Sequence, residues 1–377
     1  MHSKPHYNTD IKGDITRFDE REMLFARQDL VRYFGTDSMQ YQAYFLDKPK
    51  KEKYHLALSH KTPLGGKNST DAPMFRAQFN WIDKLGTEDA VDGEPSAHRI
   101  NISPQRAAQK VKAVAIQYGA DLAAIGPLNQ TWTYSHVGAT AGNNPAYAPW
   151  GTPIDLSRHS HAIAMGFDMD QSLLASAPKY PTMLATSQAY ARSAWASVRL
   201  AEYIRQMGYS ARAHHFSNYQ VLVVPVAVDC GLGELSRAGY LLTKTYGLGV
   251  RLSVVTTDMP MAHDIPVDIG VQSFCAVCQR CVEACPSGAI PGGDKVLHNG
   301  VMKWKLYEEK CYAYWHVNGT DCGICMDVCP WTKPNTPFHR LMAELASKKG
   351  LHQKWMAKAD RLVYGAHKPA PKPDYLD

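Results

Sequence analysis

Residues 275–286 read CAVCQRCVEACP, which fits the pattern C-x2-C-x2-C-x3-C-P of bacterial iron–sulfur proteins. A companion motif, CYAYWHVNGTDCGICMDVCP, occupies residues 311–330 and ends in the same Cys-Pro pair. Thiolates suit iron because they are soft, anionic donors, and the short spacings let one turn of the chain wrap around a cluster. Together the motifs predict two [4Fe–4S] clusters.

In two-cluster ferredoxins the fourth cysteine of each motif ligates the other cluster. This crossover predicts one ligand set of Cys275, Cys278, Cys281 and Cys329. The second predicted set is Cys285, Cys311, Cys322 and Cys325. Two such clusters in series carry electrons one at a time, so they need an electron acceptor elsewhere in the chain.

Structural zinc is the alternative at these cysteines, because Cys278/Cys281 and Cys322/Cys325 also have the spacing of zinc knuckles. Zinc sites do not need the crossover cysteine before proline, which occurs twice here, so the iron–sulfur interpretation is favoured. Clustering of the cysteines argues against disulfides. The isolated Cys230 is predicted to be a small buried hydrophobic residue.

The composition is that of a globular protein, with 377 residues of which 45% are hydrophobic and 20% charged. This length predicts two or three domains. The net charge of +6 could favour an acidic electron donor or an anionic surface, but it is not the basic stripe of a nucleic-acid-binding protein. Taken as it stands, the sequence predicts no export, because it shows no signal core, twin-arginine pair or membrane-spanning run. A mature form from which a leader was removed would look the same.

Before the cysteines, the sequence predicts alternating helices and strands. Ser103 is a good helix N-cap and Gly119 a good helix end, and a second, longer helix is expected over 184–207. Strands are expected at 121–128, 219–228 and 251–257, although Pro225 fits a bulge or an edge better than a central strand. This alternation predicts an α/β or α+β sheet domain up to about residue 265.

Four regions are therefore expected. Residues 1–100 form a polar, loop-rich N-terminal region, with a short helical pattern at 17–31 and a loop at 63–70. The sheet domain occupies 101–265, the two-cluster module 266–335, and a C-terminal helix with an extended proline-rich tail 336–377. The acceptor must lie in the first 265 residues, where no G-x-G-x-x-G motif supports a dinucleotide.

Three stretches resemble the corrinoid-dependent reductive dehalogenases of organohalide respiration, in particular the tetrachloroethene-dehalogenase-like branch. They are RFDERE (17–22), GELSRAGYLLTKTYGLGVRL (233–252) and KCYAYWHVNGTDCGICMDVCPW (310–331). The resemblance implies an α+β fold: a nitroreductase-like corrinoid-binding core, covered by the N-terminal region and followed by the ferredoxin-like module. The implied activity removes halide from an organohalide at a cobalt corrinoid reduced through the clusters. The corrinoid is expected base-off, because the D-x-H-x-x-G signature is absent.

The resemblance also implies catalytic residues. Thr186, Tyr190, Asn218 and Arg251 match the family's site in order and separation. Tyr190 is expected to donate a proton and Asn218 to orient the substrate or contact the halide. Arg251 is expected to lower the pKa of the phenol by charge attraction. Each residue also has a structural alternative: Tyr190 could be part of the core, Asn218 a turn residue, and Arg251 the partner of a structural carboxylate.

Further residues and partners follow from the same resemblance. Thr186, Tyr246 and Trp315 are expected to contact the corrinoid, and Trp132 is another candidate for an apolar pocket. The expected partners are an organohalide, a low-potential electron donor, a second copy of the chain and a membrane-anchoring protein. Nucleic acid is not expected. The family is exported to the outer face of the cytoplasmic membrane, which leaves the localisation of this chain open.

Two other functions are possible from the sequence. Epoxyqueuosine reductase, a tRNA-modification enzyme, also joins a corrinoid domain to two clusters. In that family, however, the first and second cysteines of the second motif are normally separated by many more residues than the ten between Cys311 and Cys322. The tRNA-binding repeats of that family are also not evident. A non-catalytic iron–sulfur electron carrier is the third possibility, and it predicts no corrinoid.

Overall fold

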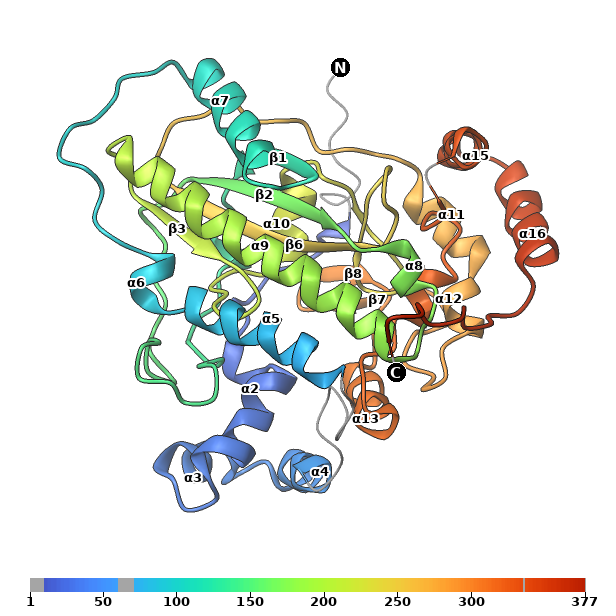
Figure 1. Cartoon of the computed structure of the whole chain (residues 1–377), viewed down its shortest axis with the longest axis horizontal. Helices are drawn as coiled ribbons and strands as arrows, with labels where there is room; N and C mark the ends of the chain where they lie inside the picture. The colour runs from blue at the N-terminus through green and yellow to red at the C-terminus, as the bar shows by residue number, and fades with distance from the viewer. Residues whose placement is uncertain (1–9, 60–70, 335, 377) are drawn as a thin grey trace.

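The fold is described by a computed structural model that covers residues 10–59, 71–334 and 336–376. Its centre is a four-stranded sheet in the order β1–β2–β6–β3, in which every neighbouring pair is antiparallel. The strands are β1 (Leu122–Pro127), β2 (His161–Asp168), β3 (Ala211–His214) and β6 (Val250–Thr257). Helices surround this sheet (Figure 1), so the predicted α+β class is confirmed.

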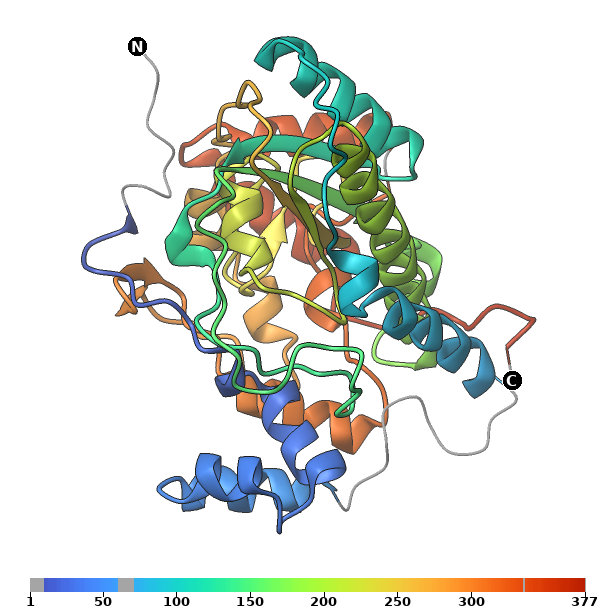
Figure 2. The same cartoon turned by 90° about the vertical axis from the view of Figure 1, so that its left-hand side faces the viewer.

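Helices cover both faces of the sheet. The long helix α9 (Tyr180–Gln206) packs on β2, β3 and β6, and α7 (Pro104–Gln117) packs on β1. The opposite face is covered by α10 (Val223–Asp229). Figure 2 shows the sheet between these helices. The central strands are consequently buried on both faces and contain few charged residues.

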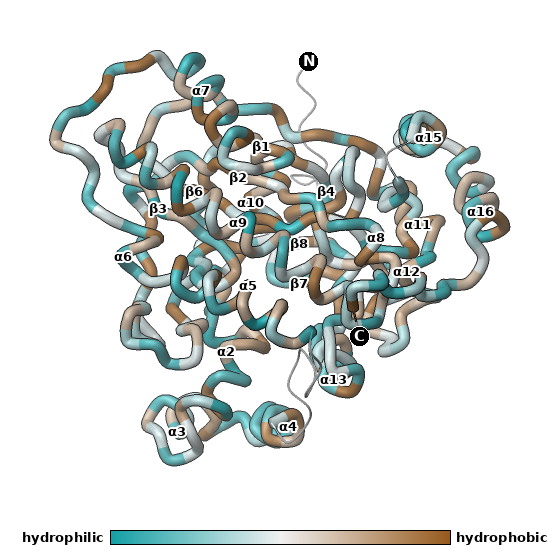
Figure 3. Tube along the Cα trace, in the orientation of Figure 1, coloured by the Kyte–Doolittle hydropathy of each residue, from teal (hydrophilic) through white to brown (hydrophobic). Residues whose placement is uncertain are grey.

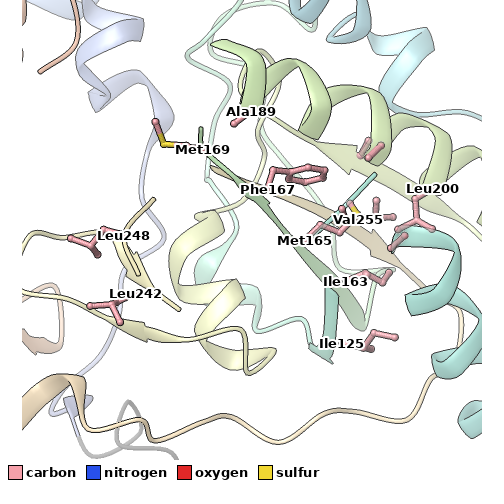
Figure 4. Close-up of a cluster of buried hydrophobic side chains, with 14 of the residues drawn as sticks. Ile125, Ile163, Met165, Phe167, Met169, Ala189, Leu200, Leu242, Leu248 and Val255 are labelled. Atoms are coloured by element: carbon pink, nitrogen blue, oxygen red, sulfur yellow. The ribbon is translucent and has the colours of Figure 1, made fainter. Parts of the chain in front are cut away.

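The main core lies between the sheet and α9. Alternate residues of β2 point to this side, and Ile163, Met165 and Phe167 are fully buried in one cluster with Leu200 of α9 (Figure 4). The intervening residues Ala162 and Ala164 belong to the second core beneath α10. Cys230 is fully buried in that second core, as predicted.

Several predicted elements are confirmed. Helix α7 begins after Ser103, whose side chain accepts a hydrogen bond from the Arg106 amide, and α9 spans the predicted long helix and starts four residues earlier. After α9 the chain turns at Gly208, whose φ of +84° suits glycine. Strands β1 and β6 also lie where the apolar patterns predict them.

The strand predicted at 219–228 is wrong. Residues Val223–Asp229 form α10, because a short apolar run fits a buried helix as well as a buried strand. Pro225 lies in the first turn of this helix, where its missing N–H costs no internal hydrogen bond. The sheet instead contains β2 and β3, which were not predicted.

The N-terminal region is richer in helices than predicted. The pattern at 17–31 breaks into a 3-10 turn (Glu20–Glu22), α2 (Leu24–Asp29) and a π-helical turn (Leu30–Phe34). They are followed by α3 (Met39–Phe45), α4 (Pro49–Ser59), α5 (Ala72–Leu85) and α6 (Glu88–Val91). The loop predicted at 63–70 lies outside the described residues.

Short elements complete the sheet region and form the cysteine module. The sheet region adds a 3-10 turn (Gln130–Trp132), α8 (Gln171–Leu174), β4 (Glu234–Leu235) and β5 (Leu241–Leu242). The module contains α11 (Val271–Cys278), α12 (Arg280–Glu283), β7 (Val296–His298), β8 (Val301–Lys303), α13 (Glu308–Asn318) and α14 (Ile324–Asp327). The predicted C-terminal helix is α15 (Pro337–Ser347), and α16 (His352–Tyr364) follows it.

None of the helices in the described part of the chain is long and apolar enough to cross a membrane.

The cysteine module packs on the sheet region through the turn before β6. Gly247 has φ +56°, and a Cβ atom on it would lie 2.4 Å from the carbonyl carbon of Trp331. The next residue, Leu248, donates its amide hydrogen to the Thr332 hydroxyl at 2.9 Å. Only glycine combines this backbone conformation with so close an approach of the two segments.

Gly247→Ala is expected to destabilise the protein by about 2–4 kcal/mol, because it adds overpacking to backbone strain. Gly119→Ala is the matched control, since Gly119 also has a positive φ of +106° but nothing lies within 4 Å of its added Cβ. It should cost only about 1 kcal/mol, the strain alone. Urea unfolding of the two variants measures the difference, and equal losses would contradict the close approach at Gly247.

The N-terminal segment is anchored by a buried carboxyl group. Glu20, in the RFDERE stretch, is almost fully buried and accepts the amide hydrogen of Gly138 at 2.8 Å. Burial raises the pKa of Glu20 to about 8, against its ordinary value of 4.5, although the Gly138 and Ala139 amides oppose the rise. The folded protein therefore holds a proton on Glu20 that the unfolded chain releases near pH 4.5.

This proton makes stability depend on pH. Stability contributed by the neutral carboxyl is complete below pH 4.5 and is lost as pH rises toward 8. Glu20→Gln, which is neutral throughout, should remove a slope of up to about 1.4 kcal/mol per pH unit in this window. Urea midpoints of parent and variant across pH 4.5–8 test this, and parallel profiles would show that Glu20 titrates normally.

Candidate active site and cluster cavities

One cavity collects the first predicted cysteine set. It lies between the cysteine module and the turns around β5. Cys275 and Cys278 come from α11, Cys281 from α12, and Cys329 from the segment after α14. All four line the cavity together with apolar residues such as Phe274 and Trp331. The residues that the crossover assigns to one cluster thus face one space.

A buried arginine lies beside this first cavity. Arg237, within the GELSRAGY stretch, donates to the Cys275 carbonyl at 3.0 Å and to the carbonyls of Pro291 and Gly293. Its guanidinium also lies 4.3 Å from the centre of the Trp304 ring. Arg237 therefore fixes the chain around Cys275 and places a positive charge beside the thiols.

A second cavity collects the other cysteine set. It is lined by Cys285, Cys311, Cys322 and Cys325. Tyr190 from α9, Arg251 from β6 and Trp315 from α13 line the same space. The predicted proton donor, its predicted charge partner and four thiols therefore share one cavity.

The described residues contain no group of three or more His, Cys, Asp or Glu side chains arranged to hold a single metal ion. Tetrahedral zinc needs its ligands about 2.0–2.3 Å from one centre. A [4Fe–4S] cluster spreads its four cysteines over four iron corners, so its ligands stand farther apart.

A hydrogen-bonded triad connects α9, β6 and the cysteine module. Arg251 donates from Nη2 to the Thr186 hydroxyl at 2.9 Å, and Thr186 donates to Asp321 Oδ2 at 2.6 Å. Arg251 and Asp321 also form a direct ion pair at 3.9 Å. Thr186 thus belongs to the triad and does not line the second cavity, and its expected contact with the corrinoid stays a prediction.

Tyr190 follows Thr186 by one helical turn and lies on the same face of α9. The guanidinium of Arg251 lies 5.1 Å from the centre of its ring, and Phe216 packs on the ring at 4.5 Å. Among the described residues the Tyr190 hydroxyl has no hydrogen-bond partner. The phenol therefore has its O–H available to a molecule in the cavity.

The pKa of Tyr190 is raised above its ordinary value of 10, with burial as the largest cause. Arg251 lowers this pKa, as predicted, while Asp321 raises it. The prediction took account of Arg251 but not of burial, which outweighs it. At neutral pH the phenol consequently keeps its proton.

Asn218 lies in a separate polar network. Its amide nitrogen donates to the Gly86 carbonyl and to Glu88, each at 2.8 Å, and its oxygen accepts from Arg212 at 3.0 Å. Arg212 also forms ion pairs with Glu88 and Asp92 at 2.9 Å. The side-chain amide of Asn218 thus uses both N–H groups on Gly86 and Glu88, and its oxygen already accepts one hydrogen bond from Arg212.

The other predicted pocket residues divide similarly. Trp315 lines the second cavity and packs on Phe25 of α2 and on Tyr312. Tyr246 does not line this cavity; it lies in the turn before β6, near Asp121 and Asp168. Trp132 is buried in the second core and donates to Asp229 at 2.7 Å.

Asp321 and Arg237 are the residues that sequence reasoning missed. Asp321 directly precedes Cys322, and this position beside a cysteine motif is the sequence signal that could have identified it. Arg237 lies within a quoted stretch of the resemblance, but nothing in its spacing indicates contact with Cys275.

Comparison with known proteins gives separate results for the cysteine module and for the rest of the chain. Residues 274–333 match the 4Fe-4S dicluster domain family, so the module is an iron–sulfur domain by sequence. Similarity to epoxyqueuosine reductase of Lactococcus garvieae, at 32% identity over 126 residues, covers 31% of this chain and 34% of that protein. This similarity is limited to a third of the chain, so the tRNA-modification alternative is less supported.

Similarity to reductive dehalogenases extends much further. Tetrachloroethene reductive dehalogenase of Sulfurospirillum multivorans is 32% identical over 284 residues, which cover 68% of this chain and 56% of that protein. A solved reductive dehalogenase, for which a mechanism of B12-dependent dehalogenation is suggested, superposes with a TM-score of 0.73 and 27% identity. The superposition covers 95% of this chain and 49% of the solved one.

The chain thus spans about half the length of the relatives that it matches. Over that length, the resemblance to reductive dehalogenases predicted from RFDERE and the cysteine motifs is confirmed, in sequence and in fold.

Proposed function

We propose that the protein removes halide from an organohalide by two-electron reduction, R–X + 2e⁻ + H⁺ → R–H + X⁻. The observation that carries this proposal is the second cavity, in which four thiols, Tyr190 and Arg251 face one space. A path for electrons and a source of protons meet there. The similarity to a tetrachloroethene reductive dehalogenase supports the reaction class.

Two [4Fe–4S] clusters would supply the electrons. The cluster in the second cavity would be held by the Cys285 set and would lie nearer to Tyr190, since Tyr190 lines that cavity. The cluster in the first cavity would be held by the Cys275 set and receive electrons from outside. N–H donation from Ala289 to the sulfur of Cys285, at 3.3 Å, is of the kind that tunes such clusters.

A corrinoid fits the second cavity by the chemistry of its lining. Apolar and aromatic residues such as Tyr240, Leu306 and Trp315 make up much of its lining, as is usual for cofactor sites, and Arg251 and Asp321 add charged groups. Arg251 Nε is buried without a partner in the described structure, so the lining offers one unused donor. When bound, a base-off corrinoid would supply the cobalt centre that cleaves carbon–halogen bonds. A nitroreductase-like origin of the sheet region belongs to the same proposal.

The residues of the chain would supply the proton and exclude water. Tyr190 would donate the phenolic proton to the carbon that loses halide, and its raised pKa prevents loss of that proton beforehand. Arg251 would stabilise the phenolate that remains, because its guanidinium is held 5.1 Å from the ring by Thr186 and Asp321. Phe216 and Trp315 would keep the space apolar.

Asn218 would need to leave Gly86, Glu88 and Arg212 to contact a substrate, so its structural role is better supported by the geometry. A corrinoid contact at Tyr246, export, a homodimer and a membrane-anchoring partner stay predictions from the resemblance.

The two cysteine sets can be tested by iron content. Cys329→Ala should lower iron in the anaerobically reconstituted protein from about eight to about four atoms per chain, because it removes one corner of the first cluster only. Cys230→Ala is the matched control, since Cys230 lies in the second hydrophobic core and not in either cavity. Iron analysis with electron paramagnetic resonance measures both, and a parent with about two zinc atoms instead would refute the assignment.

The proton donor can be tested by turnover. Tyr190→Phe should lower halide release from tetrachloroethene or an aryl bromide by about 100-fold or more, because general acid catalysis is lost while the ring remains. Iron and corrinoid content should stay at the parent level. Full activity in this variant with normal cofactor content would remove Tyr190 from the role.

Asn218→Ala serves as the comparison. It should lower the free energy of unfolding by about 1–3 kcal/mol, because Arg212 and Gly86 lose a buried partner, with a much smaller effect on turnover in the folded fraction. A stable Asn218→Ala variant without activity would instead support the catalytic role predicted from the sequence.

A further inference from the structure

The helices α15 and α16 lie at the edge of the molecule (Figures 1 and 3) and carry exposed apolar side chains. Large apolar side chains that would normally be buried are exposed here; Trp355 is 71% exposed and Leu362 86%. We define the outer face of α15–α16 by Phe338, Leu341, Leu345, Leu351, Trp355 and Leu362. Large apolar side chains exposed together on neighbouring helices are typical of interaction sites in soluble proteins.

The exposed residues follow the helical repeat. Leu351, Trp355 and Leu362 are separated by four and seven residues and therefore lie along one side of α16. The residues Gln353 and Ala357 on the opposite side are buried against the cysteine module and α15. Packing onto the protein's own core thus accounts for one side of α16 and leaves the apolar outer side without a function.

The same helices have an excess of positive charge. Residues 337–364 contain six Lys and Arg against two Asp and Glu, a net +4 of the chain's +6. Lys354 and Lys358 are exposed and flank Trp355 in the sequence. An apolar centre with a charged rim is the usual anatomy of a protein–protein interface, and the sign of this rim fits an acidic partner.

This surface lies over the first cysteine cavity. Arg361 of α16 donates to the carbonyl of Cys278 and pairs with Glu283 at 2.6 Å. Arg280 pairs with Asp360 at 3.1 Å and donates to the Gly365 carbonyl at 2.8 Å. A molecule bound on the outer face of α15–α16 would therefore be separated from the Cys275 set by little more than α16 itself.

We propose that the outer face of α15–α16 is the docking surface for the electron donor, a small acidic iron–sulfur or flavin protein. This inference rests on the proposed function, which requires electrons to enter at the Cys275 set. In each encounter the reduced donor loses one electron and the cluster of the first cavity gains it. Two encounters supply the electrons for one halide.

Two other occupants fit less well. A second copy of the chain docked face to face would place the basic rims against each other, which is electrostatically unfavourable. An anionic lipid surface would match the apolar and basic character, but it gives no reason for the contacts that Asp360 and Arg361 of α16 make with the cysteine motif.

The test compares a protein donor with a small reductant. The reconstituted full chain with oxidised clusters is mixed either with a reduced acidic bacterial ferredoxin or with dithionite, and bleaching of the cluster absorption is followed by stopped flow. The triple variant L351S/W355S/L362S should be reduced by the ferredoxin at least about tenfold more slowly, because the apolar centre of the interface is lost. Its reduction by dithionite should equal that of the parent.

Charge variants give a second measurement. K354E/K358E should also slow reduction by ferredoxin, and the rate should fall less with added salt than in the parent, because steering of the acidic donor is lost. Trp81→Ser on α5 and Lys110→Glu on α7 are matched controls, since both residues are exposed on helices far from α16 (Figure 1). Both controls should retain the parent's rate.

Equal rates with ferredoxin in the parent and in both sets of variants would overturn the docking surface. So would variants that lose binding to phosphatidylglycerol vesicles, or that become monomeric from a dimeric parent, while their ferredoxin rate is unchanged. A parent that takes up no clusters would overturn this inference and the proposed function together. Clusters that dithionite reduces without any halide release would overturn the proposed function alone.

Discussion

The hydrogen bonds from Arg251 to Thr186 and from Thr186 to Asp321 hold together three parts of the chain. Thr186 belongs to α9, Arg251 to β6, and Asp321 directly precedes a cysteine of the second motif. Buried charges are tolerated only when they are paired and hydrogen-bonded, so this arrangement constrains all three segments at once. The cavity that contains both thiols and a phenol exists because these segments meet.

The same triad determines the electrostatics around Tyr190. Burial raises the pKa of the phenol and the charge of Arg251 opposes the rise, so the balance depends on how closely Thr186 and Asp321 hold the guanidinium. In the proposed reaction this balance matters in two ways. The phenol must keep its proton until the carbon–halogen bond breaks, and the phenolate formed afterwards must be stabilised. The guanidinium beside the ring stabilises the phenolate, while burial still keeps the phenol protonated until then.

The sequence predicted the features that local patterns encode. The cysteine spacing, the cap at Ser103, and the apolar repeat and glycine end of α9 depend on nearby residues, and all appear in the structure. The run at 219–228 was misassigned because short apolar segments fit a buried helix or strand equally. Strands β2 and β3 pair with β6 over long sequence separations, which no local pattern reveals. Asn218 was predicted as a match to the family's site and Tyr246 as an aromatic pocket residue, but the groups near them in the structure come from segments far away in the sequence.

The central claim is that the iron–sulfur module serves a cobalt corrinoid within the same chain. Metal analysis of the anaerobically reconstituted protein, after incubation with cobalamin and removal of unbound cofactor, tests it most directly. The account predicts about one cobalt atom for every eight iron atoms. Iron at that level without retained cobalt, for every corrinoid offered, would contradict the account and indicate an electron carrier.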